Sequence, residues 1–212
     1  MKLAAVQYRP PKGQPDQARQ EIAGWAHRAG EAGADLLVFP ELITTGYECG
    51  VQFTDLAERV PGPTVNLIAQ RAADYGTHVL FGMASKEKVE SILYDTAVLI
   101  GPDGDVMGQY NKVHLRGEER LAFRPGFRYN VWETEFGNVG VMLGWDLAFP
   151  ETARSLALDG AEVLCVCANW GYAPNAEREL HAHEWRTYTQ ARALENSCYV
   201  VASNRIGEEY SY

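Results

Sequence analysis

Short, wholly apolar runs alternate with longer amphipathic stretches along this chain, and the pattern predicts strands and helices in turn. Residues 36–39 and 163–168 carry only apolar side chains, as strands do when both faces of a sheet are covered. Residues 15–32 instead repeat their apolar positions at helical spacing, and Gly33 follows where a helix would end. The two periodicities together indicate an α/β protein.

The same criteria predict elements along the whole chain. Strands are expected at residues 2–7, 36–39, 79–84, 93–100, 106–110, 130–134, 139–143, 163–168 and 199–203. Helices are expected at residues 15–32, 63–75, 149–159 and 179–196, with a further helical stretch after the loop at 44–47. Helices alternate with strands near both ends, while strands cluster as hairpins in the middle. We therefore expect one layered α/β domain over residues 1–212, with a mixed sheet.

The stretch from Asn138 to Glu151 joins a buried strand to a helix opened by Pro150 through a sharp turn at Gly144. Such a turn holds one residue at the edge of the sheet, beside free N–H groups at the helix start, and is a place where enzymes present a nucleophile. Glycine offers no side chain there. Taken alone, Gly144 also has a simple conformational explanation, because a strained turn often excludes a Cβ.

Polar residues follow several of the predicted strands at the end where α/β sheets bind ligands. They are Glu41, Lys112, Asp146, Asn169 and the neighbouring Trp170. A carboxylate and an amine brought to one edge can act as a base and as a stabiliser of negative charge. On spacing alone, an ordinary ion pair between Glu41 and Lys112, or two solvated loop charges, is the favoured explanation.

Composition narrows the range of partners. The formal charge is −9 and no Lys/Arg-rich run is present, so the sequence predicts neither nucleic-acid nor membrane-surface binding. No apolar run approaches the ~18 residues of a membrane span, and no signal peptide is recognisable, which predicts a cytoplasmic protein. A small neutral or cationic ligand is the expected partner.

The metal-binding residue types show no metal-site spacing, and we expect no metal or cofactor. The four cysteines, Cys49, Cys165, Cys167 and Cys198, lie in or beside apolar runs and are interpreted as free thiols in a reducing compartment. His181 and His183 are two residues apart on a predicted helix and would point in different directions.

Read together, these segments resemble the nitrilase superfamily, the carbon-nitrogen hydrolases. The matching segments are Gln7, Phe39-Pro-Glu41, Thr45-Gly-Tyr47, Asn111-Lys-Val-His-Leu115, Glu119, Pro125-Gly126, Trp145-Asp146, Phe149-Pro-Glu151, Arg192-Ala-Leu-Glu-Asn196 and Asn204-Arg-Ile-Gly207. They span nearly the whole chain in the family's order. The resemblance implies an α-β-β-α sandwich with mixed sheets and a homodimer or higher homo-oligomer. The family usually continues with further strands, which this sequence lacks after Tyr212, so an open sheet edge is expected.

Carried over by position, the resemblance makes Glu41 the general base, Lys112 the cation beside the tetrahedral intermediate, and Glu119 a second carboxylate that positions the substrate. The family's nucleophilic cysteine corresponds to Gly144. The family's thiolate attacks an amide or nitrile carbon, an amine leaves, and water cleaves the thioester. The N–H of Trp145 would join Lys112 in stabilising the oxyanion.

Without a thiol at position 144 no acyl-enzyme can form, and loss of a nucleophile costs roughly 10⁶ in turnover. We therefore expect an inactive chain that binds its small amide uncleaved. Either a deliberate substitution or a natural loss of chemistry fits, and the intact flanking residues favour the first. Cys167 is a poor replacement nucleophile because it is not on the turn.

Other possibilities concern the ligand. The substrate could instead be a nitrile. Alternatively, the chain is a regulatory binding protein, or a structural domain without a ligand. By their places after strand ends, Tyr47, Trp145, Asn169 and Trp170 are predicted to line the substrate pocket, whose aromatic wall favours a compact or partly apolar ligand.

Overall fold

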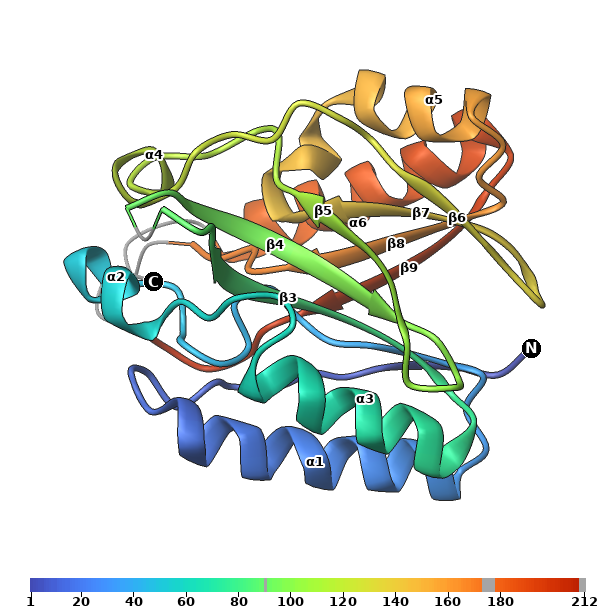
Figure 1. Ribbon diagram of the computed structural model, residues 1–212. Helices are drawn as coiled ribbons and strands as arrows, with labels where there is room; N and C mark the ends of the chain where they lie inside the picture. Colours follow the sequence, from blue (N-terminus) through green and yellow to red (C-terminus); the bar gives the residue numbers. More distant parts are fainter. Residues whose placement is uncertain (90, 173–177, 210–212) are drawn as a thin grey trace.

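Two β-sheets pack face to face, and helices cover the outer face of each, which gives four layers (Figure 1). This arrangement is seen in a computed structural model that describes residues 1–89, 91–172 and 178–209. The fold class predicted from the sequence, an α/β sandwich with mixed sheets, is confirmed.

The first sheet has five strands in chain order. They are β1 (Leu3–Ala5), β2 (Leu36–Val38), β3 (His78–Lys86), β4 (Leu93–Ile100) and β5 (Val106–Asn111). The pairs β1–β2 and β2–β3 are parallel, whereas β3–β4 and β4–β5 are antiparallel. The β4–β5 hairpin closes through the Gly101-Pro-Asp-Gly104 turn, in which the Gly104 N–H donates to the Gly101 carbonyl at 3.0 Å.

The second sheet has four strands, also in chain order. They are β6 (Val131–Thr134), β7 (Gly137–Leu143), β8 (Val163–Ala168) and β9 (Tyr199–Asn204). Only β6–β7 is antiparallel, so the carboxyl ends of β7, β8 and β9 meet at one edge. Polar residues that follow these strands are therefore brought together.

Four long helices form the outer layers. They are α1 (Pro15–Glu31) and α3 (Pro63–Tyr75) on the first sheet, and α5 (Pro150–Leu158) and α6 (Arg178–Asn196) on the second. Three of them begin with proline at the first turn, where its missing N–H costs nothing. The short segments are η1 (Gly50–Gln52), α2 (Phe53–Leu56), α4 (Glu119–Ala122) and η2 (Gly144–Ala148).

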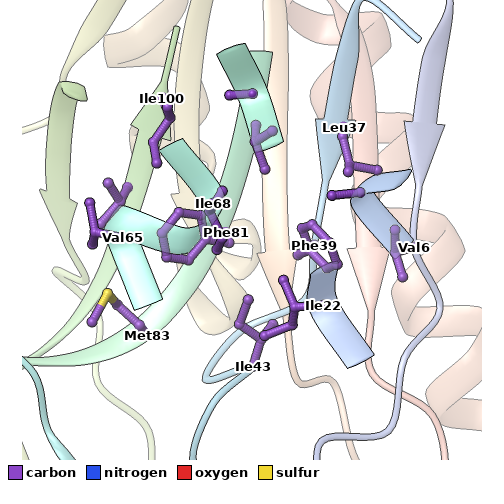
Figure 2. Close-up of a cluster of buried hydrophobic side chains, with 14 of the residues drawn as sticks. Val6, Ile22, Leu37, Phe39, Ile43, Val65, Ile68, Phe81, Met83 and Ile100 are labelled. Atoms are coloured by element: carbon purple, nitrogen blue, oxygen red, sulfur yellow. The ribbon is translucent and has the colours of Figure 1, made fainter. Parts of the chain in front are cut away.

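Each pair of neighbouring layers has its own apolar core. Figure 2 shows the core beneath α1 and α3, where Ile22 and Ile68 face Phe39 and Phe81 of the first sheet. A second core lies between the sheets, and a third lies between the second sheet and its helices. Strands β2 and β8 are therefore covered on both faces, as their wholly apolar sequences predict.

Most predicted elements are present with ends shifted by one or two residues. The first strand is the main difference, because residues 2–7 were expected to be extended and only Leu3–Ala5 form β1. The helical stretch expected after residues 44–47 is limited to η1 and α2. No helix among the described residues has the length and apolar character needed to cross a membrane.

Candidate active site

Glu41 lies in a loop that continues the pairing of β2 with β3. The Gly82 N–H donates to the Pro40 carbonyl at 3.1 Å, and the Ile43 N–H donates to the Gly82 carbonyl at 2.9 Å. A Cβ at Gly82 would stand 2.8 Å from the Glu41 Cα, so only glycine permits this approach. The contact fixes Glu41 at the sheet edge with its side chain 1% exposed.

Lys112 reaches the same point from the end of β5. Its N–H donates to the Asp95 carbonyl at 2.9 Å, which extends the hairpin by one residue. Its Nζ lies 2.5 Å from Glu41 Oε1 and 2.7 Å from Glu119 Oε1, and the side chain is 1% exposed. The structure thus brings together the amine and the two carboxylates that the resemblance had placed in one site.

Glu119 is the first residue of α4, a short helix in the loop that follows β5. The Arg116 N–H donates to Glu119 Oε2 at 2.7 Å, and the Tyr47 hydroxyl donates to Oε1. Glu119 is therefore held by a backbone donor, a phenol and the Lys112 ammonium, with its side chain buried.

The buried charges shift one another's protonation. Burial alone would raise the pKa of Glu41, but the Lys112 charge and hydrogen bonds lower it below its usual value. Burial would lower the pKa of Lys112, yet Glu41 and Glu119 raise it well above its usual value. The pKa of Glu119 is raised, chiefly by burial. These shifts favour the ionised form of Glu41 and the charged form of Lys112.

Gly144 occupies the turn from β7 into η2 with φ +41°, a left-handed conformation that favours glycine. A Cβ built on it would lie 2.7 Å from Glu41 Oε2 and 3.1 Å from Lys112 Nζ. A side chain at this position would therefore point at both the carboxylate and the ammonium. The turn also has the strained strand-to-helix form in which nucleophiles are presented.

Little space is left beside Gly144. Glu41 and Lys112 approach the glycine directly, and the cavity beside them holds about 20 Å³, roughly one water molecule. Side chains have to move before an amide can occupy this cavity.

The residues that line this cavity include the predicted pocket residues Tyr47, Trp145, Asn169 and Trp170, together with Lys112, Glu119, Arg116 and Gly171. The rings of Trp145 and Trp170 lie 5.1 Å apart, and the Arg116 guanidinium lies 4.3 Å from the centre of the Trp145 ring. Asn169 contributes its backbone N–H, which donates to Glu41 Oε2 at 2.8 Å. The wall thus combines three aromatic side chains with the charged side chains of Lys112, Arg116 and Glu119.

Asp146, grouped with the site residues by sequence, anchors the turn instead. Its Oδ2 accepts the Leu143 N–H at 3.1 Å and the Tyr110 hydroxyl at 2.6 Å. Its Oδ1 accepts the His114 N–H at 2.9 Å, and the His114 ring nitrogen lies at the same distance. Asp146 is fully buried and does not line the cavity.

Two residues near the cluster were missed by the sequence reasoning. Arg116 lies in a loop with no periodic signal, so nothing in the sequence indicated its stacking on Trp145. Asp95 did carry a signal, because it interrupts the alternating apolar face of β4 that contains Ala97 and Leu99. It is fully buried, and its Oδ2 lies 3.6 Å from Lys112 Nζ.

Cysteine and histidine contribute little to the site. Cys49, Cys165 and Cys167 are buried free thiols, and Cys198 is half-buried. Burial raises the pKa of Cys167 well above its usual value, and Cys165, Glu41 and Asp95 raise it further, so this thiol is unsuited to replace a nucleophile. Within residues 1–89, 91–172 and 178–209, no group of His, Cys, Asp and Glu side chains has the arrangement of a metal site.

Comparison with known proteins places this geometry in context. The family model for carbon-nitrogen hydrolase matches residues 2–212. A probable nitrilase of Schizosaccharomyces pombe is 38% identical over 211 residues, which cover 98% of this chain and 75% of that protein. A nitrilase of Pyrococcus abyssi is 37% identical over 215 residues, covering 99% and 76%. Among solved structures, a cysteine-to-alanine mutant of the amidase from Nesterenkonia sp. AN1 in complex with butyramide has a TM-score of 0.87 and 27% identity, and the match covers 99% of this chain and 78% of that one.

Proposed function

We infer that this chain, which belongs to the carbon-nitrogen hydrolase family, keeps a binding site for a small amide but lacks the atom that would attack it. One observation carries the proposal. A Cβ at Gly144 would point at both Glu41 Oε2 and Lys112 Nζ, from 2.7 and 3.1 Å. A thiol attached there would have a base and a cation in contact with it.

Each side chain in the cluster has a role in this proposal. Glu41 is the general base, because it is ionised and faces position 144. Lys112 would stabilise negative charge on the amide oxygen, and the N–H of Trp145, near the start of η2, would assist it. Glu119 positions the substrate amide group from beside Lys112.

The missing thiol limits the chemistry. In the reaction implied by the resemblance, Glu41 removes the thiol proton, sulfur attacks the amide carbon, the amine leaves, and water cleaves the thioester. With Gly144 the first bond to sulfur cannot form, so a bound amide stays intact. We expect turnover lower by roughly 10⁶ than that of a chain with the thiol.

The substrate is proposed to be a compact amide. Tyr47, Trp145 and Trp170 give the cavity an aromatic wall, which suits a short apolar group next to the amide. The amidase from Nesterenkonia sp. AN1 has been solved with butyramide, which has these features. A small nitrile is the alternative substrate, because two relatives are named as nitrilases.

A second candidate function is a non-catalytic sensor or regulatory protein. The small size of the cavity, about 20 Å³, and the direct approach of Glu41 and Lys112 to Gly144 favour it, because little room is kept for a nucleophile. Hydrolysis of an amide by a Gly144→Cys variant would support the enzyme lineage, and inactivity over a broad amide and nitrile panel would support the regulatory function.

Binding of butyramide to the unaltered chain, measured by calorimetry, tests the proposed function. Glu119→Gln should weaken binding by roughly tenfold or more, because a charge-assisted hydrogen bond is lost. Glu118→Gln makes the same change at the neighbouring exposed residue and should bind as the unaltered chain does. Glu41→Gln is a second site variant. Absence of binding in the unaltered chain and in every variant would instead support a structural domain without a ligand.

A homo-oligomer is also proposed, through the outer face of α5, α6 and β9. Large apolar side chains are exposed there, with Leu158 at 78%, Leu194 at 82% and Tyr199 at 76%. Such a surface is typical of a protein interface. Light scattering of the purified chain should give the mass of a dimer or higher oligomer, and Leu194→Glu should shift it toward the monomer.

A further inference from the structure

Asp95 is the least satisfied carboxyl group in the described part of the chain. It lies on the inter-sheet face of β4, is fully buried, and neither of its oxygens has a hydrogen-bond partner among the described residues. The nearest cation, Lys112 Nζ, is 3.6 Å from Oδ2. An ionised carboxylate left in this state would carry a large desolvation cost.

The other two acids of the cluster are better supplied with donors. Glu41 accepts the Lys112 ammonium and the Asn169 N–H. Glu119 accepts the same ammonium, a phenol and a backbone N–H. Because full ionisation would place three carboxylates around one ammonium, a net charge of −2 would be buried. A proton retained by the acid without donors removes half of that excess.

We propose that Asp95 is a positioning residue, a neutral carboxylic acid that keeps its proton, donates a hydrogen bond to the Glu41 carboxylate and holds this base against Lys112. Its protonation state is argued from its burial and its lack of donors, whereas its catalytic purpose rests on the proposed function. A carboxylic acid is a donor only when protonated, so Asp95 can satisfy Glu41 in this form and no other. The arrangement keeps Glu41 ionised and aimed at position 144.

The surrounding charges favour this state. Burial raises the pKa of Asp95 well above its usual value, and the neighbouring Glu41 raises it further, through its charge and through the hydrogen bond that a protonated Asp95 would donate. Lys112 opposes the shift and Glu119 adds to it. The same hydrogen bond lowers the pKa of Glu41. Cys167 of β8 lies near the group as well, and burial raises the pKa of its thiol well above its usual value.

Infrared spectroscopy of the unaltered chain tests the protonation state without relying on ligand binding. A band from a protonated carboxylic acid should be present at neutral pH and should shift when aspartate, but not glutamate, is labelled with ¹³C. Asp95→Asn should abolish the band, and Asp55→Asn, at an exposed site, should leave it. A spectrum with no aspartate-sensitive acid band at neutral pH would overturn the proposal.

Stability as a function of pH gives a second test. Because the folded pKa of Asp95 is raised, the folded state holds a proton that the unfolded state releases above pH ~4. This contribution to stability is fully present below that pH. As pH rises above it, the folding constant falls roughly tenfold for each pH unit. Asparagine does not titrate, so Asp95→Asn should gain stability relative to the unaltered chain over the same range. Parallel pH profiles for the two proteins would contradict the neutral acid.

A comparison of two substitutions at Asp95 tests the positioning role. Asparagine keeps a donor for Glu41, whereas leucine has similar size and none. Asp95→Asn should bind butyramide within roughly threefold of the unaltered chain, and Asp95→Leu should bind roughly tenfold more weakly. Equal affinities for the two variants would contradict positioning. Failure of the unaltered chain to bind butyramide counts against the proposed function, and the labelled spectrum still decides the state of Asp95.

Discussion

The Asp146 network and the Lys112 cluster lie at neighbouring strand ends and stabilise buried carboxylates in opposite ways. Asp146 receives donors from the Leu143 N–H, the His114 N–H and the Tyr110 hydroxyl. In the Lys112 cluster a single ammonium serves several acids, with Glu41 at 2.5 Å and Glu119 at 2.7 Å. Asp146 draws on separate donors from the backbone and from side chains, whereas Glu41 and Glu119 each have a backbone donor and in addition share one ammonium.

The difference indicates that the Asp146 network supports the structure and that the Lys112 cluster can bind a ligand. Backbone donors cannot be displaced by a substrate, so the Asp146 network suits a part that keeps the turn at Gly144 in place. An ammonium shared between carboxylates can exchange one partner for an amide oxygen, which suits a binding site. The Lys112 cluster should therefore be the more fragile of the two when a single side chain is removed.

Lys112→Met should have the largest effect on folding. The change leaves Glu41 and Glu119 buried without their cation, and breaking a buried ion pair costs about 3–5 kcal/mol. Urea denaturation of the variant and of the exposed control Lys88→Met gives the difference in the free energy of unfolding. A loss below about 1 kcal/mol would show that the cluster does not depend on its one ammonium.

Asp146→Asn should have a smaller effect. The amide keeps one acceptor oxygen but leaves a buried donor unpaired, which costs about 1–3 kcal/mol. Asp55→Asn is the surface control, measured by the same denaturation. A larger loss than that of Lys112→Met would reverse the ranking of the two regions.

Tyr47→Phe should have the smallest effect on stability. Only the hydroxyl that donates to Glu119 is removed, which costs about 0.5–1.5 kcal/mol. Tyr75→Phe, which removes a more exposed hydroxyl near His27, should cost less. Thermal denaturation measures both variants, and a loss of several kcal/mol for Tyr47→Phe would give this phenol a role in folding.

The sequence predicts the layers well because their signals are local. Residues 163–168 are a continuous apolar run, and Pro150 and Pro63 mark helix starts. The ends of β1 were less predictable, because residues 6 and 7 follow it without a change in composition.

The site was only partly predictable. Glu41, Lys112 and Glu119 were assembled through the resemblance, since spacing alone cannot show that three distant loops meet. Asp95 was missed although it breaks the apolar alternation of β4, because its partners come from other elements. The closeness of Glu41 to Gly144 depends on packing at Gly82, which no periodic pattern reports.

We propose that this sheet edge keeps the arrangement of a thiol hydrolase from which a single sulfur atom is missing. The most direct measurement is ammonia release from a panel of small amides by Gly144→Cys, beside Gly144→Ala and the unaltered chain. Gly144→Ala adds the same Cβ against Glu41 without a thiol, so it controls for crowding and for strain at φ +41°. We predict release by the cysteine variant alone, faster than either control by up to roughly 10⁶. A folded cysteine variant that releases no ammonia from any amide would contradict the account.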